Sequence, residues 1–173
     1  DTNNFRNNFS PTNIILKSNS VVEFLNSCFT GMNNLENLEI EGEQIIIKNN
    51  CFNNCFNKNY SRSKMTIKIQ SRSKIKIEDN CFNNCTSLEI IEIVGDQIYI
   101  GNNCFNSCFS TPNQNKNHYS PKIFKITSNS HIEIGNNCFN ECNYLEKLEI
   151  AGNLITIDKE YFKELSSSTP FII

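Results

Sequence analysis

The residues in this sequence best suited to chemistry are its nine cysteines, most of which recur in a Cys-Phe-x-x-Cys pattern. Closely spaced thiolates can ligate a metal such as zinc. Stacked cysteines can also form disulfides, because adjacent strands lie about 4.8 Å apart and bridged Cα atoms about 4.4–6.8 Å apart. A free cysteine can instead pack as a small hydrophobe. The four complete pairs are Cys51/Cys55, Cys81/Cys85, Cys104/Cys108 and Cys138/Cys142.

Substitutions within the repeated pattern favour packing over sulfur chemistry. Phe5 and Tyr161 occupy the first cysteine position in two weaker copies. Phe9, Met32 and Leu165 occupy the second. A position that accepts any apolar side chain does not require a thiol, and the odd number of cysteines points the same way. We therefore predict buried, free thiols and no cofactor, with a disulfide framework and a metal site as the two less favoured alternatives.

The two histidines form no recognisable catalytic arrangement. His118 lies in a polar insertion and His131 at the start of an apolar segment, and neither has a partnered carboxylate. The sequence also lacks a glycine-rich phosphate loop, a Gly-x-Ser-x-Gly elbow and a His-Glu-x-x-His motif. The prediction is therefore a protein that is not an enzyme.

The Cys-Phe pattern repeats along the whole chain with a basal period of 23 residues. This period falls within the range of leucine-rich repeats. Two longer steps, of 30 and 34 residues, contain polar insertions at 57–64 and 110–122, which we expect to protrude from one edge as surface loops. The copies begin near residues 5, 28, 51, 81, 104, 138 and 161, which predicts a single domain, 1–173, of about seven turns.

Each regular turn carries its apolar residues in the same order. Residues 148–150 and 155–157, for example, alternate apolar and polar side chains, which predicts two short strands. The i, i+1, i+4 spacing of Cys-Phe-x-x-Cys predicts a short helical or 3₁₀ turn. Gly42, Gly95 and Gly152 fall between the two strands, where a bend favours glycine. We therefore predict an α/β repeat solenoid, a right-handed coil with a parallel sheet on one face and second short strands beside it.

The repeat resembles the BspA-like leucine-rich repeats. Residues 134–150 read Ile-Gly-Asn-Asn-Cys-Phe-Asn-Glu-Cys-Asn-Tyr-Leu-Glu-Lys-Leu-Glu-Ile. They follow that family's pattern of Ile-Gly-x-x-Ala-Phe-x-x-Cys-x-x-Leu-x-x-Ile-x-Ile closely, with Cys138 in place of the usual alanine. The resemblance implies a solenoid with a parallel sheet on one face, and roles in protein binding and surface adhesion. It transfers no catalytic residues.

Aligning the first strands of the turns predicts a row of charges with alternating sign. The central residue of each strand points away from the core, and parallel stacking places these residues side by side. Two readings remain open: a solvated face whose signs avoid repulsion, or a polar binding surface. Ile15 and Ile172 occupy the two ends of the row. The five charges of the row are Glu39, Lys68, Glu92, Lys125 and Glu149.

We predict a binding surface that combines the charged row with residues of the two insertions. The insertion residues of this candidate surface are Tyr60, Arg62, Lys64 and Tyr119. The partner would be a protein ligand or a host or cell-surface component. The formal net charge of −2 does not favour nucleic acid, and no segment approaches the roughly 18 apolar residues that span a membrane.

The leading function is a non-catalytic protein-binding or adhesion scaffold. The alternative is a structural protein that self-assembles into homo-oligomers through open end turns, because the last turn stops on its first strand. The family resemblance favours the cell surface, whereas reduced buried thiols favour a reducing compartment such as the cytoplasm.

Overall fold

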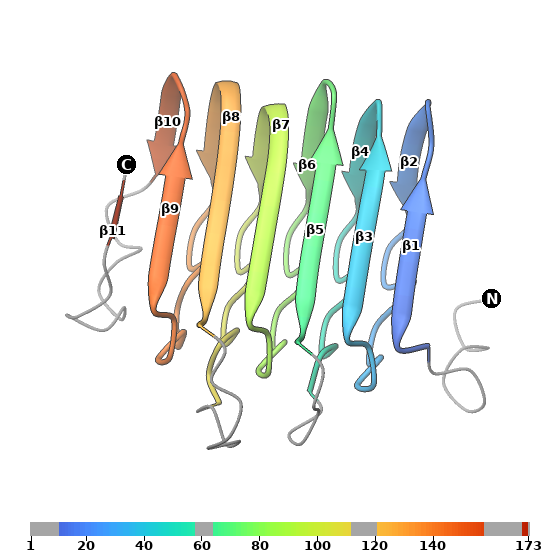
Figure 1. Cartoon of the computed structure of the whole chain (residues 1–173), viewed down its shortest axis with the longest axis vertical. Coiled ribbons are helices and arrows are strands. Elements are labelled where there is room, and N and C mark those ends of the chain that lie inside the picture. Colours follow the sequence, from blue (N-terminus) through green and yellow to red (C-terminus); the bar gives the residue numbers. More distant parts are fainter. Residues whose placement is uncertain (1–10, 58–63, 112–120, 158–170, 173) are drawn as a thin grey trace.

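A computed structural model of the chain describes residues 11–57, 64–111, 121–157 and 171–172. These residues wind as a stack of coils that form two rows of parallel strands (Figure 1). The first row holds β1 (Asn13–Lys17), β3 (Asn37–Gly42), β5 (Thr66–Ser71), β9 (Lys147–Ala151) and β11 (Phe171–Ile172). The second holds β2 (Val21–Phe24), β4 (Gln44–Ile47), β6 (Lys74–Ile77) and β10 (Leu154–Ile157). The longer strands β7 (Ile90–Ile100) and β8 (Ile123–Ile134) run through both rows.

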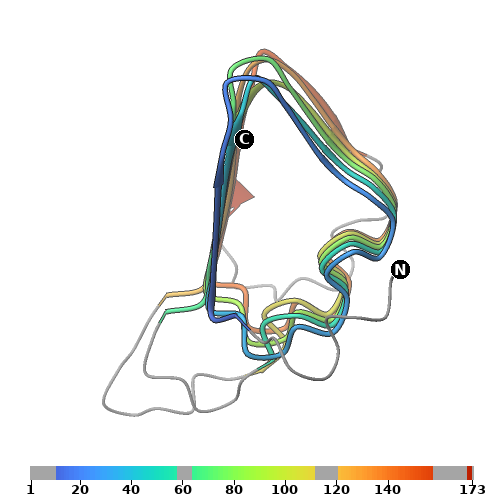
Figure 2. The same cartoon turned by 90° about the vertical axis from the view of Figure 1, so that its right-hand side faces the viewer.

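Strand formation follows from the alternation of isoleucine with polar residues. In β5, Ile67 and Ile69 are buried, whereas Lys68 between them is exposed. In β6, Ile75 and Ile77 repeat the same alternation on the second row. Viewed along the stack, the first strands superpose on one straight side of a roughly triangular coil, and the second strands form another side (Figure 2). The predicted parallel sheet and second short strands are therefore confirmed.

Glycine is required at the corner between the two strands because the coils approach closely there. A Cβ atom at Gly95 would lie 3.0 Å from Ile75 Cδ1 of the preceding coil, and one at Gly152 would lie 3.0 Å from Ile132 Cδ1. Neither glycine has a positive φ angle. The space taken by the neighbouring isoleucine, rather than an unusual backbone angle, therefore selects glycine at these corners.

The prediction of a helical or 3₁₀ turn, and with it the α/β class, is wrong for the described residues, which contain no helix. Consequently, none of them forms a helix that could span a membrane. In the coil that starts at Cys51, every second residue has a left-handed φ angle: 60° at Asn50, 56° at Phe52, 56° at Asn54 and 53° at Phe56. This alternation folds the segment into successive turns instead of a helix.

Hydrogen bonds to the next coil alternate with local turn bonds in this segment, such as the one from the Cys51 N–H to Lys48 O at 3.3 Å. The backbone N–H of Asn50 donates to Asp79 O at 3.0 Å, and that of Asn54 donates to Asn83 O at 2.9 Å. Asparagine tolerates the left-handed region better than most residues, which accounts for its recurrence beside each cysteine. Hydrogen bonds from these backbone N–H groups to carbonyl groups of the neighbouring coil therefore determine the local conformation.

Phenylalanines of the same pattern fill the centre of the core. Phe52, Phe82 and Phe105 are fully buried and stack with ring centroids 5.1 and 5.2 Å apart and nearly parallel planes. Phe82 and Phe105 also have left-handed φ angles, of 57° and 59°. A bulky residue avoids this region by about 1–2 kcal/mol, so the packing of the stack holds the backbone there.

Several parts of the predicted repeat lie outside the described residues. They include most of each insertion, 58–63 and 112–120, and the opening residues of the weak copies that begin at Phe5 and Tyr161. The expected protrusion of both insertions from one edge and the total of about seven turns remain predictions.

Asn80 provides a test of the left-handed positions. Its φ angle is 57°, so Asn80→Ala should lower the free energy of unfolding by about 1 kcal/mol, whereas Asn80→Gly should leave it nearly unchanged. Urea unfolding followed by circular dichroism measures both. Asn83, in the same pattern but without a positive φ, is the matched control, and an equal loss in Asn83→Ala would contradict this explanation.

Candidate protein-binding surface

The five predicted charges lie in one row across the first strands. Glu39 is in register with Lys68, which is in register with Glu92. Glu92 lies beside Lys125, and Lys125 lies beside Glu149. None of the five is buried. The predicted register and its outward orientation are therefore confirmed, whereas the binding role of these residues remains a proposal.

Lysines neutralise the carboxylate at the N-terminal end of this row. Lys17 Nζ lies 2.9 Å from Glu39 Oε1 and 3.6 Å from Glu41 Oε2. The hydrogen bond from Lys17, with added attraction from Lys17 and from Lys68, lowers the pKa of Glu39. Glu39 is therefore ionised at neutral pH and belongs to a continuous line of opposite charges.

The C-terminal end of the row has the same arrangement. Lys147 Nζ contacts Glu149 Oε1, and Lys125 Nζ lies 3.9 Å from Glu149 Oε2. The hydrogen bond from Lys147, with the attraction of Lys147 and Lys125, lowers the pKa of Glu149. All these groups are solvated, so the pairs contribute little stability and remain available to a partner.

Three apolar side chains and one threonine flank the charged row in its C-terminal half. Ile90 and Ile123 are in register on one side of the row, and Val94 and Thr127 are in register on the other. All four are half-buried on the outer face. The corresponding positions in β3 and β5 are polar: Asn37 beside Thr66, and Glu41 beside Gln70. Among the described strands that carry the five charges, β7 and β8 therefore combine ordered charge with flanking apolar side chains.

Sequence reasoning missed this amphipathic half, although a signal for it was present. Ile90 and Ile123 immediately precede strand residues already assigned to the core. In the sequence they therefore look like additional core residues. Their outward direction follows from the start of β7 at Ile90 and of β8 at Ile123, because alternation then places Ile91 and Phe124 inside.

The insertion residues of the candidate surface are placed only in part. Lys64 is exposed just before β5. Tyr60, Arg62 and Tyr119 lie outside the described residues, as does His118. The structure therefore brings the five charges together and leaves the contribution of the insertions a prediction.

The outer face of the second strands carries a smaller cluster centred on Tyr99. Lys74 Nζ lies 4.6 Å from the centroid of the Tyr99 ring, and His131 packs against that ring edge-to-face at 5.6 Å. A shallow hollow of about 480 Å³ adjoins it, with Glu78 and Glu133 among its lining residues. His131 is thus held by ring packing and by Thr156, 3.4 Å from its Nε2.

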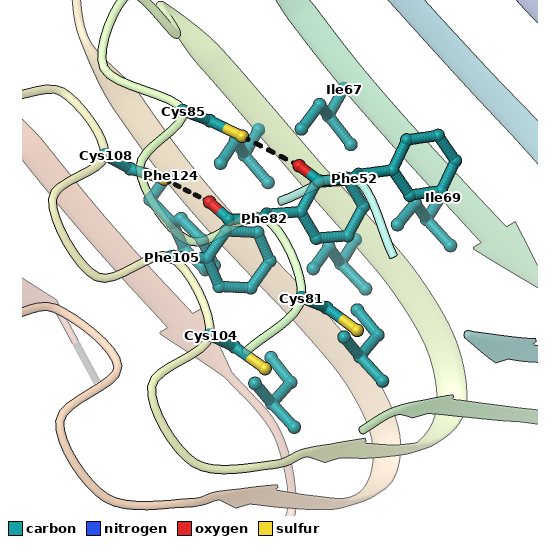
Figure 3. Close-up of a cluster of buried hydrophobic side chains, with 14 of the residues drawn as sticks. Phe52, Ile67, Ile69, Cys81, Phe82, Cys85, Cys104, Phe105, Cys108 and Phe124 are labelled. Atoms are coloured by element: carbon teal, nitrogen blue, oxygen red, sulfur yellow. Dashed lines mark hydrogen bonds between the residues drawn. The ribbon is translucent and has the colours of Figure 1, made fainter. Parts of the chain in front are cut away.

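The cysteines are free thiols, and all except the half-buried Cys28 are buried in the core. The predicted packing role is therefore confirmed, with one addition. Cys85 Sγ donates to Phe52 O at 3.2 Å, and Cys108 Sγ donates to Phe82 O at 3.0 Å (Figure 3). Each thiol thus satisfies a backbone carbonyl of the preceding coil. The part of the chain that the structure describes contains no cluster of three or more metal-ligating side chains.

Burial changes the acidity of these thiols. Desolvation raises the pKa of Cys55 to about 12 and that of Cys138 to about 12. Desolvation also raises the pKa of Cys85 well above its usual range. Thiols that remain protonated are poor nucleophiles and poor metal ligands, which agrees with a structural role.

One buried cation lies at the end of the second insertion. Lys122 is 2% exposed, and its ammonium group donates a hydrogen bond to Thr111 O. Desolvation lowers the pKa of Lys122 to about 8, against the opposing attraction of Glu89 and Glu146. The contact joins residues on either side of 112–120 and therefore anchors that insertion to the coil.

The buried thiols should make the protein sensitive to alkali. A thiol with an unfolded pKa of about 8.5 and a higher folded pKa stabilises the fold below pH 8.5, and this contribution is lost as the pH rises toward the folded value. Between pH 9 and 10.5, Cys55→Ser should make the fall in unfolding free energy shallower by about 1 kcal/mol per pH unit. Urea titrations under reducing conditions measure the slopes.

Leu88→Val is the control for that experiment, because it alters a fully buried side chain that does not titrate. It should lower the unfolding free energy at every pH without changing the slope. Parallel curves for the wild type and Cys55→Ser would show that the thiol does not remain protonated in the fold.

Comparison with known proteins agrees with the repeat geometry. The model of the BspA type Leucine rich repeat region matches the chain with six copies, over residues 1–117 and 58–173. Searches of curated proteins and of solved structures give no match. The family match extends over the whole sequence and agrees with the stacked coils and the parallel sheet. The chain belongs to the BspA type leucine-rich repeat family.

Proposed function

We propose that this protein is a non-catalytic scaffold that binds another protein, such as a cell-surface component, through the outer face of its first strands. The observation that carries the proposal is the row from Glu39 to Glu149, whose charges alternate in register and lie beside half-buried apolar residues. Charge order gives specificity, and adjacent apolar surface gives affinity.

Repeat geometry supports this role. A solenoid offers a long surface on which each coil contributes a side chain at a defined position, and members of this family typically serve as protein-binding or adhesion scaffolds. The insertions that contain Tyr60, Arg62 and Tyr119 are second contributors in this proposal, because irregular loops on a rigid scaffold often determine specificity.

The experiment uses site-specific photo-crosslinking in native lysate. A photoreactive residue at Thr66, on the first-strand face, should capture a defined protein, and the same residue at Gln97, on the second-strand face, should not. The purified partner is then titrated calorimetrically against the chain. We expect Glu92→Lys and Lys125→Glu each to weaken binding at least tenfold, and Lys76→Glu, on the second-strand face, to leave it unchanged.

Deletion of residues 58–63 and 112–120 distinguishes binding by the insertions from binding by the charged first-strand face. Lost binding with an unchanged circular dichroism spectrum would assign specificity to the insertions, whereas retained binding would assign it to the charged face. Binding that is insensitive to both the deletions and the face variants would contradict the proposal.

Self-assembly through the end turns is a second candidate. Ile15, Val21 and Leu25 of the N-terminal described coil are 61%, 52% and 62% exposed, and exposed apolar side chains of this size favour association. If the end turn mediates assembly, the double variant Val21→Lys/Leu25→Lys should lower the mass measured by light scattering. An unchanged mass would exclude this coil as the contact.

A further inference from the structure

The first-strand face is flat enough to meet a second flat surface. The first strands superpose along one straight side of the coil when viewed along the stack (Figure 2), and parallel pairing continues without a register shift from β1 through β3 and β5 to β7. A flat sheet keeps its rows of side chains straight, so two such faces can match row against row.

The order of charges restricts how the face can meet a second copy of itself. A rotation of 180° about an axis parallel to the strands brings the faces together, keeps each residue at its level and reverses the order of strands. If the axis passed through β7, Glu92 would meet its own copy. If it passes midway between β7 and β8, Glu92 faces Lys125 of the second copy and Lys68 faces Glu149 of the second copy.

The same axis also matches the apolar flanks. It places Ile90 opposite Ile123 of the second copy and Val94 opposite Thr127 of the second copy, because these residues are already level with each other within one chain. Moving the axis to lie between β5 and β7 would instead oppose Ile90 with Thr66 and Val94 with Gln70. The alternating charges exclude an axis through a strand, but an axis between β5 and β7 would also oppose unlike charges, Lys68 with Glu92. The contact of Ile90 with Ile123 selects the axis between β7 and β8.

We infer that this face recognises a second copy of the chain, and that two molecules pair face to face about an axis between β7 and β8. The inference rests on the proposed role of the face as a protein-binding surface and names one partner for it. The interface is isologous, so each opposed pair occurs twice. Glu92 and Lys125 form its centre, with Ile90 and Ile123 packed beside them.

The dimer is weak and sensitive to salt. Four opposed strands, spaced about 4.8 Å apart and about 20 Å long, cover roughly 400 Å² on each copy, so the total of roughly 800 Å² belongs to the range of transient contacts. Its central charges lie near the surface and are screened by added salt. Association is therefore expected at high protein concentration and low ionic strength.

A charge swap tests the pairing. Sedimentation equilibrium of the reduced full chain at low salt should show a monomer–dimer equilibrium. Glu92→Lys and Lys125→Glu should each raise the dissociation constant at least tenfold, because each sets like charges against each other twice. The double variant Glu92→Lys/Lys125→Glu should return it to within about threefold of the wild type, because opposite charges face each other again.

The double variant separates pairing between molecules from effects within one. Inside each chain it leaves a lysine at position 92 beside Lys68 and a carboxylate at position 125 beside Glu149, so the row itself stays disrupted. Rescue of the dimer therefore supports the face-to-face contact. Failure of rescue, with circular dichroism showing intact folding, would overturn it, as would a wild-type chain that stays monomeric at high concentration.

Two controls complete the test. Lys76→Glu on the second strands and Val21→Lys/Leu25→Lys on the end coil should leave the dimer unchanged, and loss of dimer in either would move the contact away from this face. A monomeric chain whose crosslinked protein partner is still lost in Glu92→Lys would overturn self-recognition alone. A monomeric wild type whose crosslinked partner is also unaffected by Glu92→Lys would contradict the proposed binding face as well.

Discussion

Parallel hydrogen bonding between successive coils holds each residue level with its counterpart in the next coil. A shift of one residue would turn Ile67 and Ile69 outward and Lys68 inward, because side chains alternate along a strand. The buried isoleucines thus enforce the register, and the register in turn creates every row described above. Rows of phenylalanine, cysteine and asparagine are consequences of this single constraint.

The same constraint determines the backbone of the Cys-Phe segment, which forms the third side of each coil. Phe52 and Phe82 have left-handed φ angles that an isolated chain would avoid, and they keep them because their rings stack. The N–H of Phe82 also donates to Cys51 O of the preceding coil at 3.2 Å. The cysteines fit the same segment. A thiol is small and apolar enough for the core, yet it donates to a buried carbonyl, as Cys85 does to Phe52.

The outer face follows from the same register without taking part in the core. The alternating charges from Glu39 to Glu149 avoid repulsion between coils, and this requirement alone would be met by any alternating polar row. The apolar residues beside Glu92 and Lys125 go beyond it, because they expose surface that the fold does not need to expose. The exposed part of these apolar side chains is the structural basis of the proposed binding role.

The sequence by itself determined the two strands of each coil, the burial of the cysteines and the charged row, because these follow from alternation and from a period repeated along the chain. It did not determine the path of the Cys-Phe segment. The spacing of Cys51 and Cys55 suits a helical turn as well as the run of left-handed turns that forms. The carbonyl and N–H groups of the adjoining coils favour the second. The place of Ile90 and Ile123 beside the charged row was likewise decided by the tertiary structure. Alternation assigns a residue to a face only within a strand, and the sequence does not show where each strand begins.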